Sequence, residues 1–222
     1  MKKNFNINSI DIGYSNINIF ILIKNNSIIC CERGVFLISN LFSINGNIEN
    51  IKILNESVYG AIKINNNIIA FTSNEVMSNG IDKISFYNIN RKSIINEIRG
   101  YSFNISQNNL AIIPREENES NNKILLCACK KYSKEQKNGI LLIKIQIYSN
   151  EIVIDNFYDT ENFEVYCFCP ILIIYTLNND ILNLKKNEII DTEYFLVGGF
   201  DLNKNKGLIK LYKAVYNENF VK

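Results

Sequence analysis

The six cysteines are the sharpest candidates for chemistry, and they form three close pairs: Cys30–Cys31, Cys127–Cys129 and Cys167–Cys169. The last two pairs each have one residue between the thiols, which on a strand places both thiols on one face. Four such thiolates could hold zinc tetrahedrally. Structural zinc pairs usually lie on tight turns, however, whereas these cysteines lie within apolar runs. The favoured interpretation is therefore core packing in a reducing cytoplasm, with metal binding or redox chemistry as the alternative.

Other reactive arrangements are weaker. The chain has no histidine, which removes Ser-His-Asp triads, Cys-His dyads and histidine metal ligands. Gly198-Gly199 lacks the further glycine of a dinucleotide fingerprint and the Gly-Lys-Ser/Thr of a phosphate loop. Asp155, Asp159 and Glu161 could pair as acid and base, but any acidic loop offers as much. We therefore predict a protein that is not an enzyme and has no cofactor.

Composition narrows the class of partner. The 222 residues are 47% hydrophobic and 21% charged, which is typical of a globular chain. A formal charge of +2 favours neither nucleic acid nor an anionic membrane as partner. Apolar runs are too short for a membrane-spanning helix, and polar residues interrupt the segment that follows Met1-Lys2-Lys3, so no signal peptide is expected.

Short apolar runs rich in Ile, Val, Phe and Tyr are separated by Asn, Gly, Ser and Lys, which predicts strands and turns. We expect strands at Asn18–Ile23, Ser27–Cys31, Val35–Ile38, Ile51–Leu54, Val58–Ile64, Ile68–Thr72, Lys83–Asn88, Ser93–Ile98, Ser102–Ile105, Leu110–Ile113, Ile124–Lys130, Ile140–Tyr148, Ile152–Asp155, Glu164–Cys169, Tyr194–Phe200 and Leu208–Val215. The range Ile171–Leu184 could hold two more strands.

A repeat underlies these strands. An apolar strand, an Asn-rich turn and a second apolar strand recur, and the turn residues Asn25 and Asn65 are 40 residues apart. A third copy follows, with Asn109 lying 42 residues after Asn67. Asn suits such turns because it tolerates a positive φ. A period of about 40–45 residues with four strands per unit is the spacing of β-propeller blades.

The clearest unit resembles a WD repeat. Asp82-Lys83 matches the Asp-Lys pair that opens the third strand in that family, and Tyr87-Asn88 stands where the family has Trp-Asp. Gly198-Gly199 also resembles the double glycine of Kelch repeats, and Tyr212 lies in a segment that fits a WD-type third strand. Without Trp or His, the hydrogen-bond network of a full WD repeat cannot form. The resemblance implies degenerate blades held by apolar packing.

We therefore expect one all-β domain, a partial or small β-propeller-like array of four-stranded antiparallel blades at residues 1–55, 56–100, 101–160 and 161–222. The array could close by itself with Asn6–Ile12 as the outer strand of the last blade, be completed by self-association or another protein, or be a fragment of a longer product. The expected function is a non-catalytic scaffold that binds other proteins, with Tyr132 and Tyr158 as candidate contact residues.

Overall fold

The computed structural model describes the chain at residues 17–23, 26–31, 34–39, 49–75, 81–103, 108–113, 122–132, 136–170, 173–175, 189–191 and 194–213. Within these ranges the fold is all-β, and every strand pairing is antiparallel. No helix in these ranges is long and apolar enough to cross a membrane.

Two sheets are simple four-stranded meanders. Sheet 1 contains β1 (Ile17–Ile23), β2 (Asn26–Cys31), β3 (Gly34–Ser39) and β4 (Glu49–Leu54). Sheet 2 contains β5 (Ser57–Lys63), β6 (Ile68–Glu75), β7 (Ile81–Asn88) and β8 (Ser93–Arg99). Each meander therefore lies within one predicted blade range.

Two further large sheets depart from four strands, and a fifth sheet has only two. Sheet 3 has five: β9 (Tyr101–Ser102), β10 (Leu110–Ile113), β11 (Asn122–Lys131), β12 (Lys137–Gln146) and β13 (Glu151–Glu161), because β9 also pairs with β11. Sheet 4 has three, β14 (Phe163–Pro170), β17 (Tyr194–Asp201) and β18 (Lys206–Lys213). Of the ambiguous range Ile171–Leu184, the described part contributes β15 (Ile173–Tyr175), which pairs with β16 (Ile189–Asp191).

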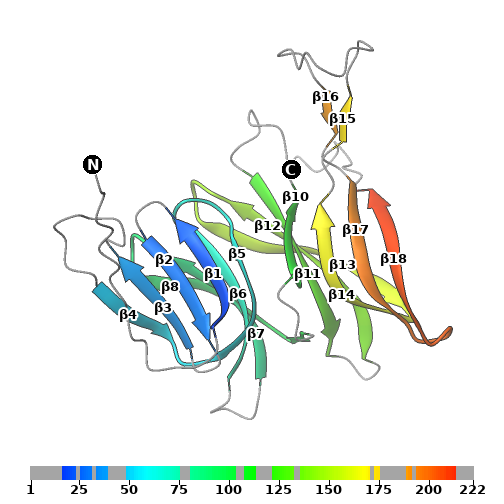
Figure 1. Ribbon diagram of the computed structural model, residues 1–222, viewed down its shortest axis with the longest axis horizontal. Coiled ribbons are helices and arrows are strands. Elements are labelled where there is room, and N and C mark those ends of the chain that lie inside the picture. The colour runs from blue at the N-terminus through cyan, green and yellow to red at the C-terminus, as the bar shows by residue number, and fades with distance from the viewer. Residues whose placement is uncertain are drawn as a thin grey trace, which may run out of the picture.

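The sheets follow one another along the long axis of the molecule, from sheet 1 in blue to sheet 4 in yellow and red (Figure 1). Three apolar cores lie between successive sheets and pack them together. Ile28, Cys30 and Leu37 of sheet 1 pack with Phe71 and Tyr87 of sheet 2. The opposite face of sheet 2 packs on sheet 3 through Ala70, Phe86, Leu125, Cys127 and Leu141, and sheet 3 packs on sheet 4 through Leu126, Ala128, Phe163, Phe168 and Val197.

In the turn between β5 and β6, Asn was predicted because it tolerates a positive φ, but its role there is different. The Asn65 side-chain carbonyl accepts hydrogen bonds from the backbone N–H groups of Asn67 (2.7 Å) and Ile68 (2.8 Å). Asn65, Asn66 and Asn67 all keep a negative φ. Asn is therefore used here as a local side-chain acceptor.

The double glycine lies in β17, the middle strand of sheet 4. A Cβ at Gly199 would lie 2.2 Å from the backbone oxygen of Glu164, and one at Gly198 would lie 2.7 Å from the Cys167 Sγ. The backbone of β14 therefore approaches β17 too closely for a side chain at Gly199, whereas a side chain at Gly198 would meet the Cys167 side chain. Gly207 on β18 is unlike them, since the nearest atom to its Cβ would be the Gly199 oxygen at 3.9 Å.

We predict that Gly199→Ala destabilises the protein by about 2 kcal/mol, because the added methyl collides with backbone that cannot rotate away. Gly207→Ala is the matched control in the same sheet, and its effect should stay within about 0.5 kcal/mol. Urea denaturation of both variants measures the difference. Equal effects of the two substitutions would contradict the close packing of β14 on β17.

Candidate protein-interaction surface

Lys83, one of the WD-like signature residues, lies in a buried ion cluster. Its Nζ is 2.6 Å from Glu56 Oε1 and 2.7 Å from Glu97 Oε1, and the lysine side chain is 5% exposed. Ser73 donates a hydrogen bond to Glu56 (2.6 Å), and Arg99 lies 3.1 Å from the second Glu97 oxygen. The cluster ties β7 to β8 and to the residue before β5. The charged groups of this cluster pair with one another, so the cluster stabilises the fold.

Asp82, the other half of that pair, supports the connection to the next sheet. One carboxylate oxygen accepts a hydrogen bond from the Asn74 side chain (2.5 Å), and the other accepts one from the backbone N–H of Phe103 (3.0 Å). Asp82 is 6% exposed, so its charge needs these donors. The Asp82-Lys83 pair therefore holds sheet 2 to the chain segment before β5 and to the segment after β9.

Tyr87 and Asn88 end β7, and they have separate roles. Tyr87 is 2% exposed in the core between sheets 1 and 2, and its hydroxyl finds no hydrogen-bond partner among the described residues. Burial raises the pKa of Tyr87. Asn88 accepts a hydrogen bond from the Arg91 backbone N–H (2.9 Å) and so closes the turn to β8.

A third polar contact crosses from sheet 2 to sheet 3. The Asn109 side-chain amide donates to Thr72 Oγ1 (2.9 Å), and both residues are fully buried. Gly60 makes room for this contact, because a Cβ there would lie 2.0 Å from Asn109 Oδ1. These polar clusters were not predicted from the sequence, whose pattern indicated apolar packing alone.

The cysteine pairs do not converge. Cys127 and Cys129 are buried on the side of sheet 3 that packs on sheet 2. Cys167 and Cys169 are opposite Gly198 and Leu196 in sheet 4, on the face turned away from sheet 3. Among the described residues, no three His, Cys, Asp or Glu side chains are grouped to hold a metal ion.

Burial also governs the thiol chemistry of two of these cysteines. Desolvation, with a smaller contribution from Cys31, raises the pKa of Cys30 to about 12. Desolvation and the neighbouring Cys129 raise the pKa of Cys127 as well. Because the thiolate is the nucleophile and the metal ligand, both residues behave as small core side chains.

Sheet 4 ends the array with an apolar face. Ile209 and Leu211 of β18 are 74% and 61% exposed, and they lie opposite Gly198 and Leu196 of β17. Leu196 and Phe200, on the same face, are partly exposed. The signal in the sequence is the run from Leu208 to Tyr212, which places apolar residues on both faces of one strand.

The inner face of sheet 4 is closed by aromatic packing. Tyr212 stacks on Phe195 with ring centroids 5.8 Å apart and a 17° interplanar angle. Tyr158 of β13, which is 54% exposed, meets Tyr212 edge-on at 6.3 Å. The other candidate contact residue, Tyr132, is 49% exposed just after β11, on sheet 3, and its backbone N–H donates to the Gly100 carbonyl (3.1 Å).

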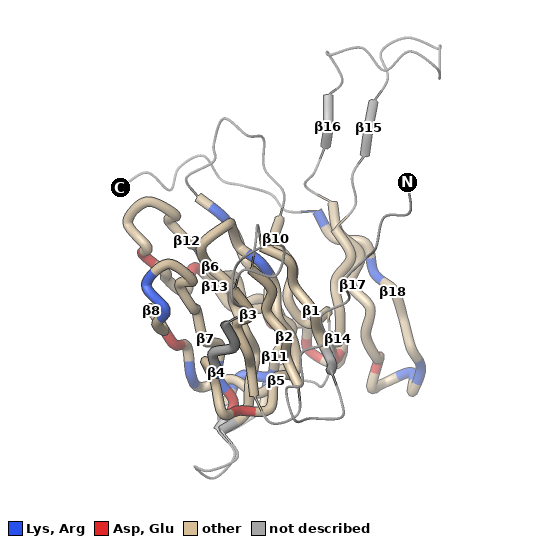
Figure 2. The backbone as a smooth tube through the Cα atoms, turned by 60° about the vertical axis from the view of Figure 1, so that its left-hand side comes forward, with Lys and Arg blue, Asp and Glu red and all other residues tan. Residues whose placement is uncertain are grey.

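The outer strands of sheets 3 and 4 carry opposite charges. Strand β13 carries Glu151, Asp155, Asp159 and Glu161, whereas β18 carries lysines at 206, 210 and 213 and no acidic residue. Figure 2 shows blue segments at both ends of β18. A shallow polar pocket of about 230 Å³ lies beside the β17–β18 turn, lined in part by Glu161, Asp201 and Lys210. That volume is below the range usual for small-molecule sites.

The sequence was compared with protein-family models and with curated proteins. The chain matches no protein-family model and no curated protein.

We predict that Lys83→Met lowers the free energy of unfolding by about 3 kcal/mol at pH 7, because it leaves two partly buried carboxylates without their shared cation. Arg99→Met is the matched control. Arg99 is 46% exposed and contacts the same Glu97, so its loss should cost less than about 1 kcal/mol. Guanidinium denaturation distinguishes the two, and similar losses would contradict a buried Lys83 centre.

The same cluster predicts a pH dependence. Burial opposes ionisation of Glu97, but hydrogen bonds from Lys83 and Arg99 outweigh it and hold the pKa of Glu97 below its ordinary value. The resulting stability is complete above the unfolded pKa of about 4.3 and is lost as the pH falls through the lower folded pKa. The stability gap between wild type and Lys83→Met should therefore stay constant above about pH 5 and narrow as the pH falls below about 4.3. A gap that stays constant in a pH series of denaturation curves would contradict this.

Proposed function

We propose that this chain is a non-catalytic protein-interaction scaffold built from degenerate WD-like blades, and that the outer face of sheet 4 is its contact surface. The observation that carries the proposal is the exposure of Ile209 (74%) and Leu211 (61%) side by side with Leu196 and Phe200. Scattered exposed apolar residues are ordinary on protein surfaces, whereas a contiguous apolar face indicates an interaction site.

The internal junctions support this choice of surface. Each of the other junctions between sheets buries an apolar face against an apolar face. The outer face of sheet 4 has the same kind of residues but is exposed at Ile209 and Leu211. A partner that covers them would repeat the packing already used inside the molecule.

The chemistry of the described ionisable groups supports a non-catalytic function. Lys83, Glu56 and Glu97 satisfy one another, and Asp82 is held by Asn74 and by a backbone N–H. The WD-like character is supported by position, since Asp82-Lys83 begins and Tyr87-Asn88 ends the third strand of a four-stranded meander.

A photo-crosslinking amino acid at position 209 tests the proposal in an extract of the cells that express the protein. We expect a defined adduct with another protein, and we expect Leu211→Lys to abolish it by placing a charge in the apolar contact. Tyr148 is the matched control site, because it is 79% exposed but lies in the β12–β13 turn. No adduct at position 209, or the same adducts from both positions, would refute this contact surface.

A further inference from the structure

The pairing registers indicate which position β18 occupies in its sheet. In sheets 1, 2 and 3 the pairing between the second and third strands of the meander is regular: β2–β3, β6–β7 and β11–β12. The pairing between the third and fourth strands has an irregularity in each of these sheets: β3–β4, β7–β8 and β12–β13. The β17–β18 pairing is regular over its whole length. Strand β18 is therefore equivalent to a third strand.

The first strands of sheets 1 and 2 give the same alignment, whereas the first pairing of sheet 3, β10–β11, is regular. The β14–β17 pairing contains a register shift, as do the pairings β1–β2 and β5–β6 that begin sheets 1 and 2. Sheet 4 thus has strands in the first, second and third positions, and β18 pairs with no described strand other than β17. The position next to β18 is that of a fourth strand.

Sheets 2 and 3 show which chemistry a fourth strand can supply. In sheet 2, Lys83 of the third strand is ion-paired with Glu97 of the fourth at 2.7 Å. In sheet 3, Lys137 of the third strand is ion-paired with Asp159 of the fourth at 3.0 Å. A lysine on the third strand therefore meets a carboxylate from the fourth in both sheets.

Strand β18 has the lysines but no carboxylates of its own. Lys206 and Lys210 lie on the face with Leu208 and Tyr212, and Lys213 lies on the opposite face with Ile209 and Leu211. A strand added in antiparallel register would meet lysines at three positions and apolar residues between them. Side chains directly opposite in such a pair are about 5 Å apart, within reach of ion pairing.

We infer that the edge of β18 that pairs with no described strand binds an extended segment of a partner protein, which adds as an antiparallel fourth strand and brings carboxylates to the β18 lysines. The inference rests on the proposed scaffold function and names the class of partner: an acidic, apolar segment recognised by strand addition. Main-chain hydrogen bonds provide the affinity of such contacts, and the alternating side chains provide their specificity.

Strands of a second copy fit this edge less well. A second β18 would bring further lysines and no carboxylate. A second β13 is acidic, but it is already a fourth strand, and two irregularities interrupt its pairing with β12. The segment Asn6–Ile12, the candidate from within the chain, lies outside the described residues.

The test uses a labelled peptide, Asp-Ile-Val-Glu-Ile-Val-Thr-Glu, designed to place an acidic residue opposite each β18 lysine. Fluorescence anisotropy with the full chain should show saturable binding. Two control peptides separate the causes: Lys in place of each acidic residue removes the charge match, and N-methylation of alternate amides removes main-chain donors. Each control should bind at least about tenfold more weakly.

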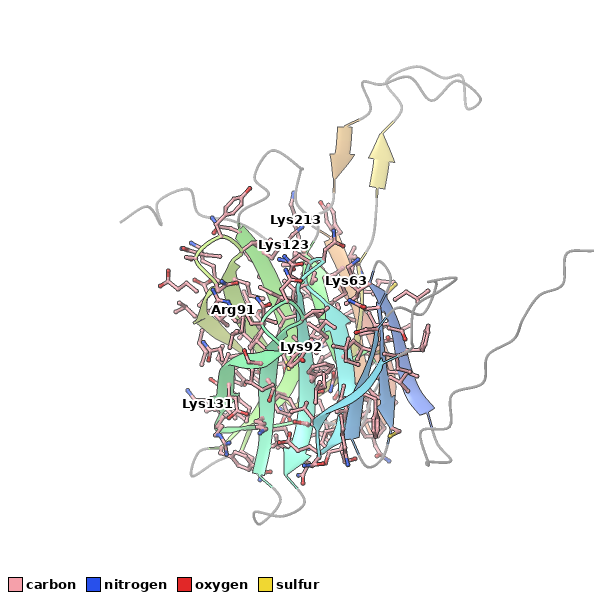
Figure 3. All side chains as sticks on the ribbon, turned by 90° about the vertical axis from the view of Figure 1, so that its left-hand side faces the viewer. Lys63, Arg91, Lys92, Lys123, Lys131 and Lys213 are labelled. Carbon is pink, nitrogen blue, oxygen red and sulfur yellow. The ribbon has the colours of Figure 1, made fainter. Side chains whose placement is uncertain are left out.

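Charge reversal on the protein locates the site. Lys206→Glu/Lys210→Glu should weaken the acidic peptide about tenfold and should restore binding of the Lys-containing peptide. Lys206→Glu alone, at an exposed position, provides the same test with the Lys210–Phe163 contact intact. Arg91→Glu is the control, because Arg91 lies on the β7–β8 turn of sheet 2, apart from Lys213 at the end of β18 (Figure 3).

Absence of peptide binding, equal binding of the N-methylated peptide, or indifference to both β18 variants would overturn the inference. So would a dimer in light scattering that Ile209→Asp converts to a monomer, because the edge would then belong to a second copy. These failures are distinct from failure of the scaffold proposal, since an adduct from position 209 would stand without peptide binding.

Discussion

The structure depends on one constraint: most strands carry apolar residues on both faces, so each sheet must be covered on both sides. Sheet 3 illustrates it, since Leu125 and Cys127 of β11 face sheet 2, whereas Leu126 and Ala128 face sheet 4. Full burial of a Leu or Ile side chain is worth about 1.5–3 kcal/mol, against at most about 1 kcal/mol for an exposed ion pair. Face-to-face stacking therefore provides most of the stability, and a row of stacked sheets necessarily leaves outward faces on its end sheets, of which that of sheet 4 is exposed at Ile209 and Leu211.

Polar clusters supply what non-directional apolar packing lacks. Burial of Asn109 and Thr72 is tolerable only if their hydrogen bond forms, which fixes sheet 3 on sheet 2 in one position. Lys83 acts similarly, since two carboxylates from different segments must reach one ammonium group. A shift of β8 along β7 would separate Glu97 from the buried Lys83 ammonium group. The Lys83 cluster lies where the WD-like pattern has its Asp-Lys pair, although the Trp and His of that pattern are missing from the chain.

The sequence predicted the strands well because their pattern is local: an apolar run between turn residues is recognisable without knowing its neighbours. The four larger sheets follow one another along the chain. Pairing of β9 with β11 was not predictable, because Tyr101–Ser102 is only two residues long and is recruited by a distant strand. Glu56 and Glu97 were missed for a related reason. They come together with Lys83 only after three segments fold, and nothing in the spacing of 56, 83 and 97 marks them.

The lysines of β18 explain how its exposed apolar face and its edge, which is unpaired among the described strands, can coexist without self-association. A long, regular, uncovered edge strand invites pairing with any other edge, and lysines are a common protection against this. Like-charged strands repel each other, so β18 resists its own copies while Ile209 and Leu211 remain exposed. The same lysines attract a strand with carboxylates, as Lys83 and Lys137 do in sheets 2 and 3. Protection against self-association and selectivity for an acidic strand are therefore two results of one charge pattern.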